Sequence, residues 1–162
     1  SKELKNFDYA FFVNANGFCN KVINEEELLS QSEDLVVAQN LGYINKNINE
    51  FPYDRNRKSN AYIPFDEGKV YVSGAFFGGK ISPFLKLVDT LEKNTDDDLK
   101  NGVIALWHDE SHLNKYILEY PNYKLLSPSY VYPEGYDSNF EPKIIMLRKR
   151  DIIPEKKIKR KP

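Results

Sequence analysis

The segment from Trp107 to Tyr116 concentrates more groups capable of chemistry than any other stretch of the sequence. It carries two imidazoles, two carboxylates, an indole, a hydroxyl and an amide. Burying so many polar and titratable groups costs solvation energy, so a function is a natural explanation for their density. We therefore expect this segment to lie at the centre of an active site.

Glu110 is the candidate catalytic residue of this segment. Leu113, Tyr116 and Ile117 recur at helical spacing, which predicts a helix that begins near Asp109. On that helix Glu110 would face inward, where a carboxylate can stabilise a developing oxocarbenium cation or attack it as a nucleophile. The alternative is that Asp109 and Glu110 are simply first-turn acids that complement the helix dipole.

The two histidines of the segment are four residues apart and could share a metal ion. A zinc peptidase needs Glu directly after the first histidine, whereas Asp109 follows His108 here. The pair His108 and His112 also has no obvious third ligand. We therefore predict packing and hydrogen bonding for them, with a metal-dependent hydrolase as the alternative.

A second candidate site follows the apolar run Phe7–Val13. Its length and aromatic content predict a buried, parallel strand, which ends abruptly at Asn14-Ala15-Asn16. Ligands of α/β sheets bind beyond the carboxyl ends of such strands. Asn14 and Asn16 are thus placed for ligand contact, although asparagine also favours turns for purely structural reasons.

Strand-like and helical segments alternate along the chain, which predicts the α/β class. Further strands are expected at 35–38, 69–79, 103–106, 124–126 and 143–147, and a short helix at 24–29. A longer helix should have Ser82 as its N-cap and Pro83 at its first position, and should end near Asn94. Residues 42–60 are predicted to form a surface loop, as is the acidic run 96–98, for which a metal role is the alternative.

Composition excludes some functions. The sequence of 162 residues has a net charge of −1, which argues against nucleic acid as a partner. Cys19 is the only cysteine, so no intrachain disulfide forms and a reducing compartment is favoured. No apolar stretch is long enough for a transmembrane segment. The basic residues after Leu147 are expected to be a solvated tail, or alternatively a contact for phosphate or anionic lipid.

The order and spacing of these motifs resemble the family-six glycosyltransferases, which include the blood-group A and B transferases and the α-1,3-galactosyltransferase. The resemblance rests on the segment from Trp107 to Tyr116, supported by collinear matches up to about Leu147. These matches are Leu126-Ser127-Pro128 with Tyr130, Phe51 with Tyr53 and Arg55, Ala61-Tyr62-Ile63-Pro64, Asp66-Glu67-Gly68 and Gly74-Ala75-Phe76-Phe77-Gly78-Gly79.

The resemblance implies a GT-A fold, a UDP-sugar donor, an oligosaccharide or glycolipid acceptor and retention of the α configuration. Glu110 matches the family's catalytic glutamate, and Asp109 the carboxylate that binds donor-sugar hydroxyls. Trp107 and His108 match residues that line the donor and acceptor sites, and Asn40 stands at an acceptor-contacting position. Residues 73–75, that is Ser73, Gly74 and Ala75, match the stretch that selects the donor sugar.

Ala75 bears on which sugar is transferred. Family members with alanine at this position tend to use galactose, and those with glycine tend to use N-acetylgalactosamine. The physical reason is that the extra methyl group occupies space which the acetamido group would need. The resemblance therefore favours UDP-galactose, although Ser73 departs from the familiar pattern.

Asn14 and Asn16 replace the Asp-x-Asp motif with which mammalian members bind manganese. Neutral amides are poor ligands for a hard cation, so we predict metal-independent catalysis with no cofactor. The charge of the leaving diphosphate then needs other partners, for which Lys149, Arg150 and Lys156 are candidates. The resemblance to bacterial members with Asn-x-Asn implies a cytoplasmic protein, associated with the inner face of a membrane as an alternative.

Compared with the family, the sequence lacks the stretch that supplies the first nucleotide-binding strands. We therefore interpret residues 1–147 as the carboxy-terminal part of one GT-A catalytic domain and residues 148–162 as a basic tail. The expected function is transfer of galactose or N-acetylgalactosamine in α linkage, as α-1,3, to a galactose-containing acceptor. The alternative from another class is a non-catalytic module that binds a nucleotide sugar or a glycan.

Overall fold

A mixed sheet forms the centre of the structure, a computed structural model in which residues 3–148 are described. Its strands are β1 (Tyr9–Val13), β4 (Val72–Lys80), β3 (Leu35–Gln39) and β5 (Tyr123–Leu126), in the spatial order β1-β4-β3-β5. β4 is antiparallel to both β1 and β3, whereas β3 and β5 are parallel. The predicted α/β class is confirmed.

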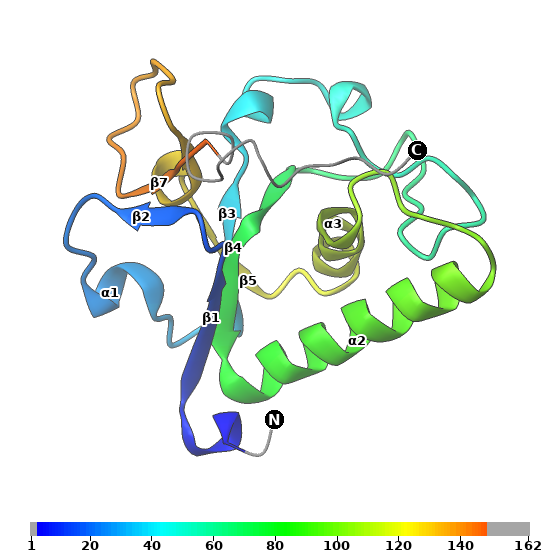
Figure 1. The fold of residues 1–162 in the computed structure, drawn as a ribbon, viewed down its shortest axis with the longest axis horizontal. Helices are drawn as coiled ribbons and strands as arrows, with labels where there is room; N and C mark the ends of the chain where they lie inside the picture. The colour runs from blue at the N-terminus through cyan, green and yellow to red at the C-terminus, as the bar shows by residue number, and fades with distance from the viewer. Residues whose placement is uncertain (1–2, 149–162) are drawn as a thin grey trace, which may run out of the picture.

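Both faces of the sheet are covered, as Figure 1 shows. Helices α2 (Ile81–Lys100) and α3 (Asp109–Glu119) cover one face, where Val37 of β3 packs against Leu87 and Leu113. On the other face Val36 packs with Tyr130 and Val131 of the 3-10 turn Pro128–Val131, beside the short helix α1 (Glu25–Leu28). Neighbouring residues of β3 thus point into different clusters, as the alternation of a strand requires.

A smaller sheet closes the second face. It consists of β2 (Gly17–Cys19), β7 (Ile144–Met146) and β6 (Tyr132–Pro133), in the order β2-β7-β6. Met146 also packs against the cluster that covers the central sheet, so the two sheets share a core.

Several elements agree with the sequence predictions. β7, α1 and the start of α3 lie within the expected segments, and β3 and β5 each exceed theirs by one residue. Helix α1 begins with a capping box in which Asn24 and Glu27 satisfy each other's backbone groups. These elements are short and locally specified, which is why pattern alone locates them.

The predicted strand at Phe7–Val13 exists, but the prediction that it is buried and parallel is wrong. β1 is an antiparallel edge strand, and Phe12 remains 38% exposed while its ring stacks on Phe77 with 5.0 Å between the centroids. A continuous apolar run is typical of a central parallel strand, but aromatic side chains on both faces of an edge strand give the same pattern.

The predicted bounds of the long helix are also wrong. α2 begins at Ile81 after Lys80, so Ser82 is not its N-cap and Pro83 lies in its first turn, where the missing amide hydrogen costs little. It continues past Asn94 to Lys100, where Gly102 with φ of 68° closes it.

The acidic run 96–98 therefore belongs to α2 and not to a solvated loop. Asp98 is 2% exposed and accepts hydrogen bonds from the Ser59 hydroxyl at 2.7 Å and from the Asn60 amide nitrogen at 2.8 Å. The buried carboxylate is stabilised by these donors, which lie far away in sequence, so the run alone gives no sign of them.

Two irregular segments differ from their predictions. Residues 103–106, expected as a strand, alternate buried and exposed side chains but pair with no strand among the described residues. The predicted surface loop 42–60 is only partly exposed: residues 56–58 and 60 face solvent, but Phe51 and Tyr53 are buried in a cluster with Tyr71. Residues 41–43 and 48–50 form short 3-10 turns within it.

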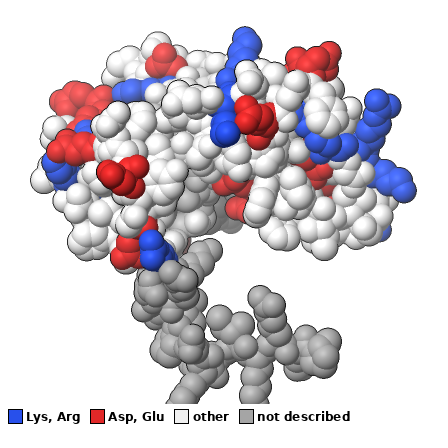
Figure 2. Space-filling view, turned by 90° about the horizontal axis from the view of Figure 1, so that it is seen from above, with Lys and Arg blue, Asp and Glu red and all other residues white. Residues whose placement is uncertain are grey.

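Charged residues of both signs are interspersed over the face seen in Figure 2. Among the helices of residues 3–148, none combines the length and the apolar character that crossing a bilayer requires.

We predict that Asp98→Ala destabilises the fold, because it removes the acceptor of the buried Ser59 hydroxyl and of the Asn60 amide groups. The expected loss is about 2–4 kcal/mol in the free energy of unfolding, measured by urea denaturation. Asp96→Ala, at an exposed position of the same helix, is the matched control and should change stability by about 0.5 kcal/mol or less. Equal effects of the two substitutions would contradict the role of the buried carboxylate.

Candidate active site

The topology of the sheet brings distant residues to one end of it. β1 and β3 both run antiparallel to β4, so they end on the same side, where β4 begins. Asn14 follows β1, Asn40 follows β3, and residues 73–75 lie at the start of β4. The amino terminus of α3 delivers Asp109 and Glu110 to the same place.

A cleft of about 400 Å³ opens at this end of the sheet. Most of the predicted site residues line it, namely Asn14, Asn40, Ser73, Gly74, Ala75, Asp109 and Glu110. The rest of its wall is more apolar and comes from Leu41, Val131, Pro133 and Met146. The fold thus brings together side chains that are widely separated in sequence, in a space large enough for a sugar ring.

Other predicted site residues lie outside the lining of this cleft. The side-chain amide of Asn16 donates to the carbonyl oxygen of Leu147 at 2.7 Å and so fixes the end of β7. Trp107 and His108 are exposed in the turn that precedes α3. The proposed diphosphate contacts Lys149, Arg150 and Lys156 fall outside the described residues.

Glu110 is held at the edge of the cleft by β4 and by Tyr71, the residue before it. Its Oε1 accepts a hydrogen bond from the Tyr71 hydroxyl at 2.6 Å, and its Oε2 accepts one from the Gly74 amide at 2.7 Å. Burial raises the pKa of the Glu110 carboxyl, the two donors act in the opposite direction, and the charge of Asp109 raises it further. The carboxylate is therefore less solvated than a surface glutamate and retains lone pairs for a ligand.

The glycine at position 74 permits this contact. A Cβ atom there would lie 3.0 Å from Cβ of Glu110 and 3.4 Å from its Cα. A glycine within a strand often marks close approach of another group, and here that group is α3.

His108 has an unusual backbone conformation. Its φ is 51° and its ψ is −124°, and among the described residues it is the only non-glycine residue with positive φ. The Glu110 amide donates to the Trp107 carbonyl at 3.1 Å across it, which closes a tight turn. Such a conformation costs of order 1–3 kcal/mol and is typical of functional sites.

Buried polar groups form hydrogen bonds with the backbone of the turn at His108. Asp54, which is 3% exposed, accepts from the Leu106 amide at 2.9 Å, and the Ser111 hydroxyl accepts from the Trp107 amide at 2.9 Å. The chain on each side of the strained residue is thereby fixed, which allows the fold to maintain the strain.

The two histidines do not share an environment. His112 is 2% exposed with its Nε2 3.6 Å from Oδ2 of Asp98, whereas His108 is exposed. Burial lowers the pKa of His112 despite the nearby Asp98. The arrangement agrees with a packed, uncharged imidazole at His112 and gives no support to the metal-dependent hydrolase.

The donor set near Asn14 does not fit a divalent cation. Two neutral amides stand there, and that of Asn16 already donates to a backbone carbonyl. Within residues 3–148, no group of three or more His, Cys, Asp or Glu side chains could hold a metal ion. Hard cations prefer several charged oxygen ligands, so we derive no step through a metal.

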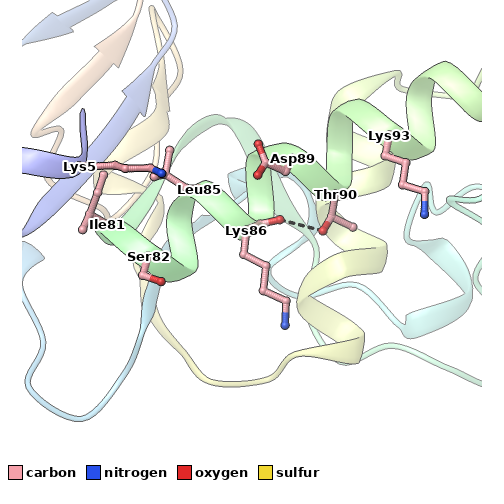
Figure 3. A pocket seen from close by; sticks show the side chains of 8 residues that line it. All are labelled: Lys5, Ile81, Ser82, Leu85, Lys86, Asp89, Thr90 and Lys93. Carbon is pink, nitrogen blue, oxygen red and sulfur yellow. Dashed lines mark hydrogen bonds between the residues drawn. The ribbon is translucent and has the colours of Figure 1, made fainter. Parts of the chain in front are cut away.

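A larger hollow of about 630 Å³ runs along the outer face of α2. Figure 3 shows its lining, in which Lys5, Lys86, Asp89 and Lys93 are the charged residues. The Thr90 hydroxyl is directed back to the Lys86 carbonyl, a bond within the helix itself. This open surface groove presents solvated lysines and lacks the converging groups that the cleft has.

Two residues important to the site were not predicted from the sequence. Tyr71 and Asp54 contact the site only through folding, since they are 39 and 52 residues from their partners Glu110 and Leu106. Asp54 lies in a segment that the sequence predicts to be a surface loop, so no sequence pattern indicates that it is buried. For Tyr71, the glycine three residues later was the available hint that another element approaches β4.

Comparisons with known proteins show the family of the chain. The model of glycosyltransferase family 6 matches residues 2–158. The O-antigen biosynthesis glycosyltransferase WbnI of Escherichia coli is 35% identical over 147 residues, which are 91% of this chain and 62% of that protein. The fold and the family match together define the class, and the chain belongs to glycosyltransferase family 6.

Animal relatives are similar over shorter stretches. The histo-blood group ABO system transferase 1 of Rattus norvegicus is 44% identical over 93 residues, which are 57% of this chain and 27% of that protein. The globoside alpha-1,3-N-acetylgalactosaminyltransferase 1 of Gallus gallus is 37% identical over 115 residues, which are 71% of this chain and 33% of that protein. The chain spans less than two thirds of the length of each of these relatives.

The strain at His108 predicts an unusual order of stability for two variants. His108→Gly and His108→Ala both remove the imidazole, but only glycine relieves the positive φ. We expect His108→Gly to be more stable than His108→Ala by about 1 kcal/mol or more in urea denaturation. An alanine variant as stable as the glycine variant would show that the turn carries no strain.

Proposed function

We propose that the protein containing this chain is a retaining glycosyltransferase. It transfers galactose, or N-acetylgalactosamine, in α-1,3 linkage from a UDP-sugar to a galactose-containing acceptor glycan. The observation that carries the proposal is the clamped Glu110 carboxylate, which lines the same cleft as Asp109 and residues 73–75. The family membership supports it independently.

The charge in the cleft suits the proposed transition state. When the bond between the anomeric carbon and the diphosphate breaks, its electrons leave with UDP and positive charge develops on the sugar. A carboxylate held in place before the reaction stabilises that charge without reorganising, either as an ion pair or by forming a bond. Asp109, beside Glu110 on the cleft wall, is suited to accept hydrogen bonds from hydroxyls of the donor sugar.

We further propose that the reaction needs no metal ion. Asn14 and Asn16 are neutral, so the charge of the departing diphosphate must be compensated by cationic side chains. The chain leaves β7 at Met146, which lines the cleft, and the basic residues Lys149, Arg150 and Lys156 follow within ten positions. This proximity in sequence makes the basic segment the leading candidate for the diphosphate contact.

The mixed sheet supports assignment to the GT-A arrangement. Its cleft lies beyond the ends of β1 and β3, which is the ligand-binding position of α/β sheets. Within that arrangement, residues 1–147 would form the carboxy-terminal part of the catalytic domain.

Activity should depend on Glu110 and not on a metal. In the full-length protein, incubated with UDP-galactose and galactosyl acceptors, we expect UDP release to continue in EDTA. Glu110→Gln keeps the size of the side chain but removes the charge, so kcat should fall by about 10²–10³. Glu119→Gln, at an exposed position of the same helix, is the control and should leave kcat unchanged.

The outcomes of this assay separate the alternatives. If the wild type binds a UDP-sugar but does not turn it over, the alternative of a non-catalytic binding module is correct. Loss of turnover in EDTA would refute metal independence alone, whereas full activity of Glu110→Gln would refute the catalytic assignment.

Donor choice should respond to the methyl group at position 75. Ala75 lines the cleft, so Ala75→Gly opens space for an acetamido group. We expect the ratio of N-acetylgalactosamine to galactose transfer to rise by about tenfold, measured as kcat/KM for the two donors. Ala10→Gly, in β1 and outside the cleft lining, is the control. An unchanged donor ratio in Ala75→Gly would mean that the donor sugar does not bind next to residue 75.

A further inference from the structure

Tyr71 is a rigid donor to the carboxylate at position 110. It is 1% exposed and lies in the aromatic cluster with Tyr43, Phe51 and Tyr53. Its ring centroid is 4.9 Å from that of Tyr43 and 5.6 Å from that of Tyr53. Dense packing around the ring restricts its movement, so its hydroxyl is held where it meets Glu110.

The backbone of Glu110 is anchored to the same strand. The Asn114 side chain, which is 2% exposed, donates to the carbonyl oxygens of both Glu110 and Val72 at 2.9 Å. It also accepts from the Val72 amide at 3.0 Å. With the Gly74 amide on Oε2, the first turn of α3 is thus fixed to β4 independently of any ligand.

The Tyr71 hydroxyl is the one side-chain donor to this carboxylate among the described residues. Burial raises the pKa of Tyr71, and the adjacent carboxylate raises it further, so the hydroxyl stays protonated and remains a donor. The charge of the neighbouring Asp109 raises the pKa of Glu110 and so disfavours a second negative charge there. The donors from Tyr71 and Gly74 therefore oppose both burial and this repulsion.

We propose that Tyr71 is a positioning residue for the reaction: its hydroxyl orients the Glu110 carboxylate toward the cleft and maintains it in the ionised form. The inference rests on the catalytic role proposed for Glu110. It extends that role by explaining how a partly buried glutamate beside an aspartate remains charged.

The test is the pH dependence of kcat/KM in the full-length protein for wild type and Tyr71→Phe. Phenylalanine keeps the ring in the cluster and removes only the hydroxyl. Loss of a donor to the charged form raises the pKa of Glu110, so the acidic limb of the profile should move to higher pH, by about one pH unit. Activity should accordingly fall more at low pH than at high pH.

Tyr53→Phe is the matched control. It removes a hydroxyl from the same aromatic cluster, and that hydroxyl donates to the Val70 carbonyl at the same distance of 2.6 Å. We expect its acidic limb to coincide with that of the wild type. Equal shifts in the two variants, or no shift in Tyr71→Phe, would overturn the inference.

A titration of the Glu110 side-chain carboxyl carbon by ¹³C NMR gives a second readout that does not need turnover. The apparent pKa of Glu110 should rise in Tyr71→Phe and stay constant in Tyr53→Phe. If Glu110→Gln proves fully active while this titration shifts as expected, the contact is real and only the proposed catalytic role fails. If the titration does not shift, the positioning role fails whatever the activity.

Discussion

The structure of the site depends on the attachment of the first turn of α3 to β4. Tyr71 and Gly74 each donate a hydrogen bond to one carboxylate oxygen of Glu110. The side-chain amide of Asn114 donates to the backbone carbonyls of both Glu110 and Val72 and so links them. A glycine favours this contact, because a Cβ at position 74 would lie only 3.0 Å from Cβ of Glu110. A carboxylate bound from one side by the protein offers its remaining lone pairs to the cleft, which is the preorganisation that charge stabilisation needs.

Neighbouring elements stabilise the strained turn that leads into this attachment. The preceding turn carries positive φ at His108, and the buried Asp54 and Ser111 hold the chain on both sides of it. Asp98 at the end of α2 in turn fixes the segment after Asp54 through Ser59. The segment 42–60, which has no clear pattern in the sequence, thus helps to hold the turn that precedes α3.

The sequence predicted the residues that line the cleft better than the strands, helices and buried groups that hold them in place. Glu110 and Asn14 were found from their residue types and their place after predicted elements, whereas Asp109 and Ala75 were found through the resemblance to the family, and the fold does bring them to one cleft. The edge position of β1, the length of α2 and the burial of Asp98 were missed, because they depend on partners far away in the chain. Local pattern reports propensity and periodicity, whereas a buried carboxylate is recognised only with its donors in place.

The central claim is that the Glu110 carboxylate faces the anomeric carbon of a bound nucleotide sugar. A crystal structure of the full-length protein with an unreactive UDP-galactose analogue tests it most directly. The account predicts a carboxylate oxygen about 3–3.5 Å from the anomeric carbon, on the side opposite the diphosphate, with the Tyr71 contact preserved. A sugar bound away from Glu110, or a Glu110 side chain turned to solvent in that complex, would contradict it.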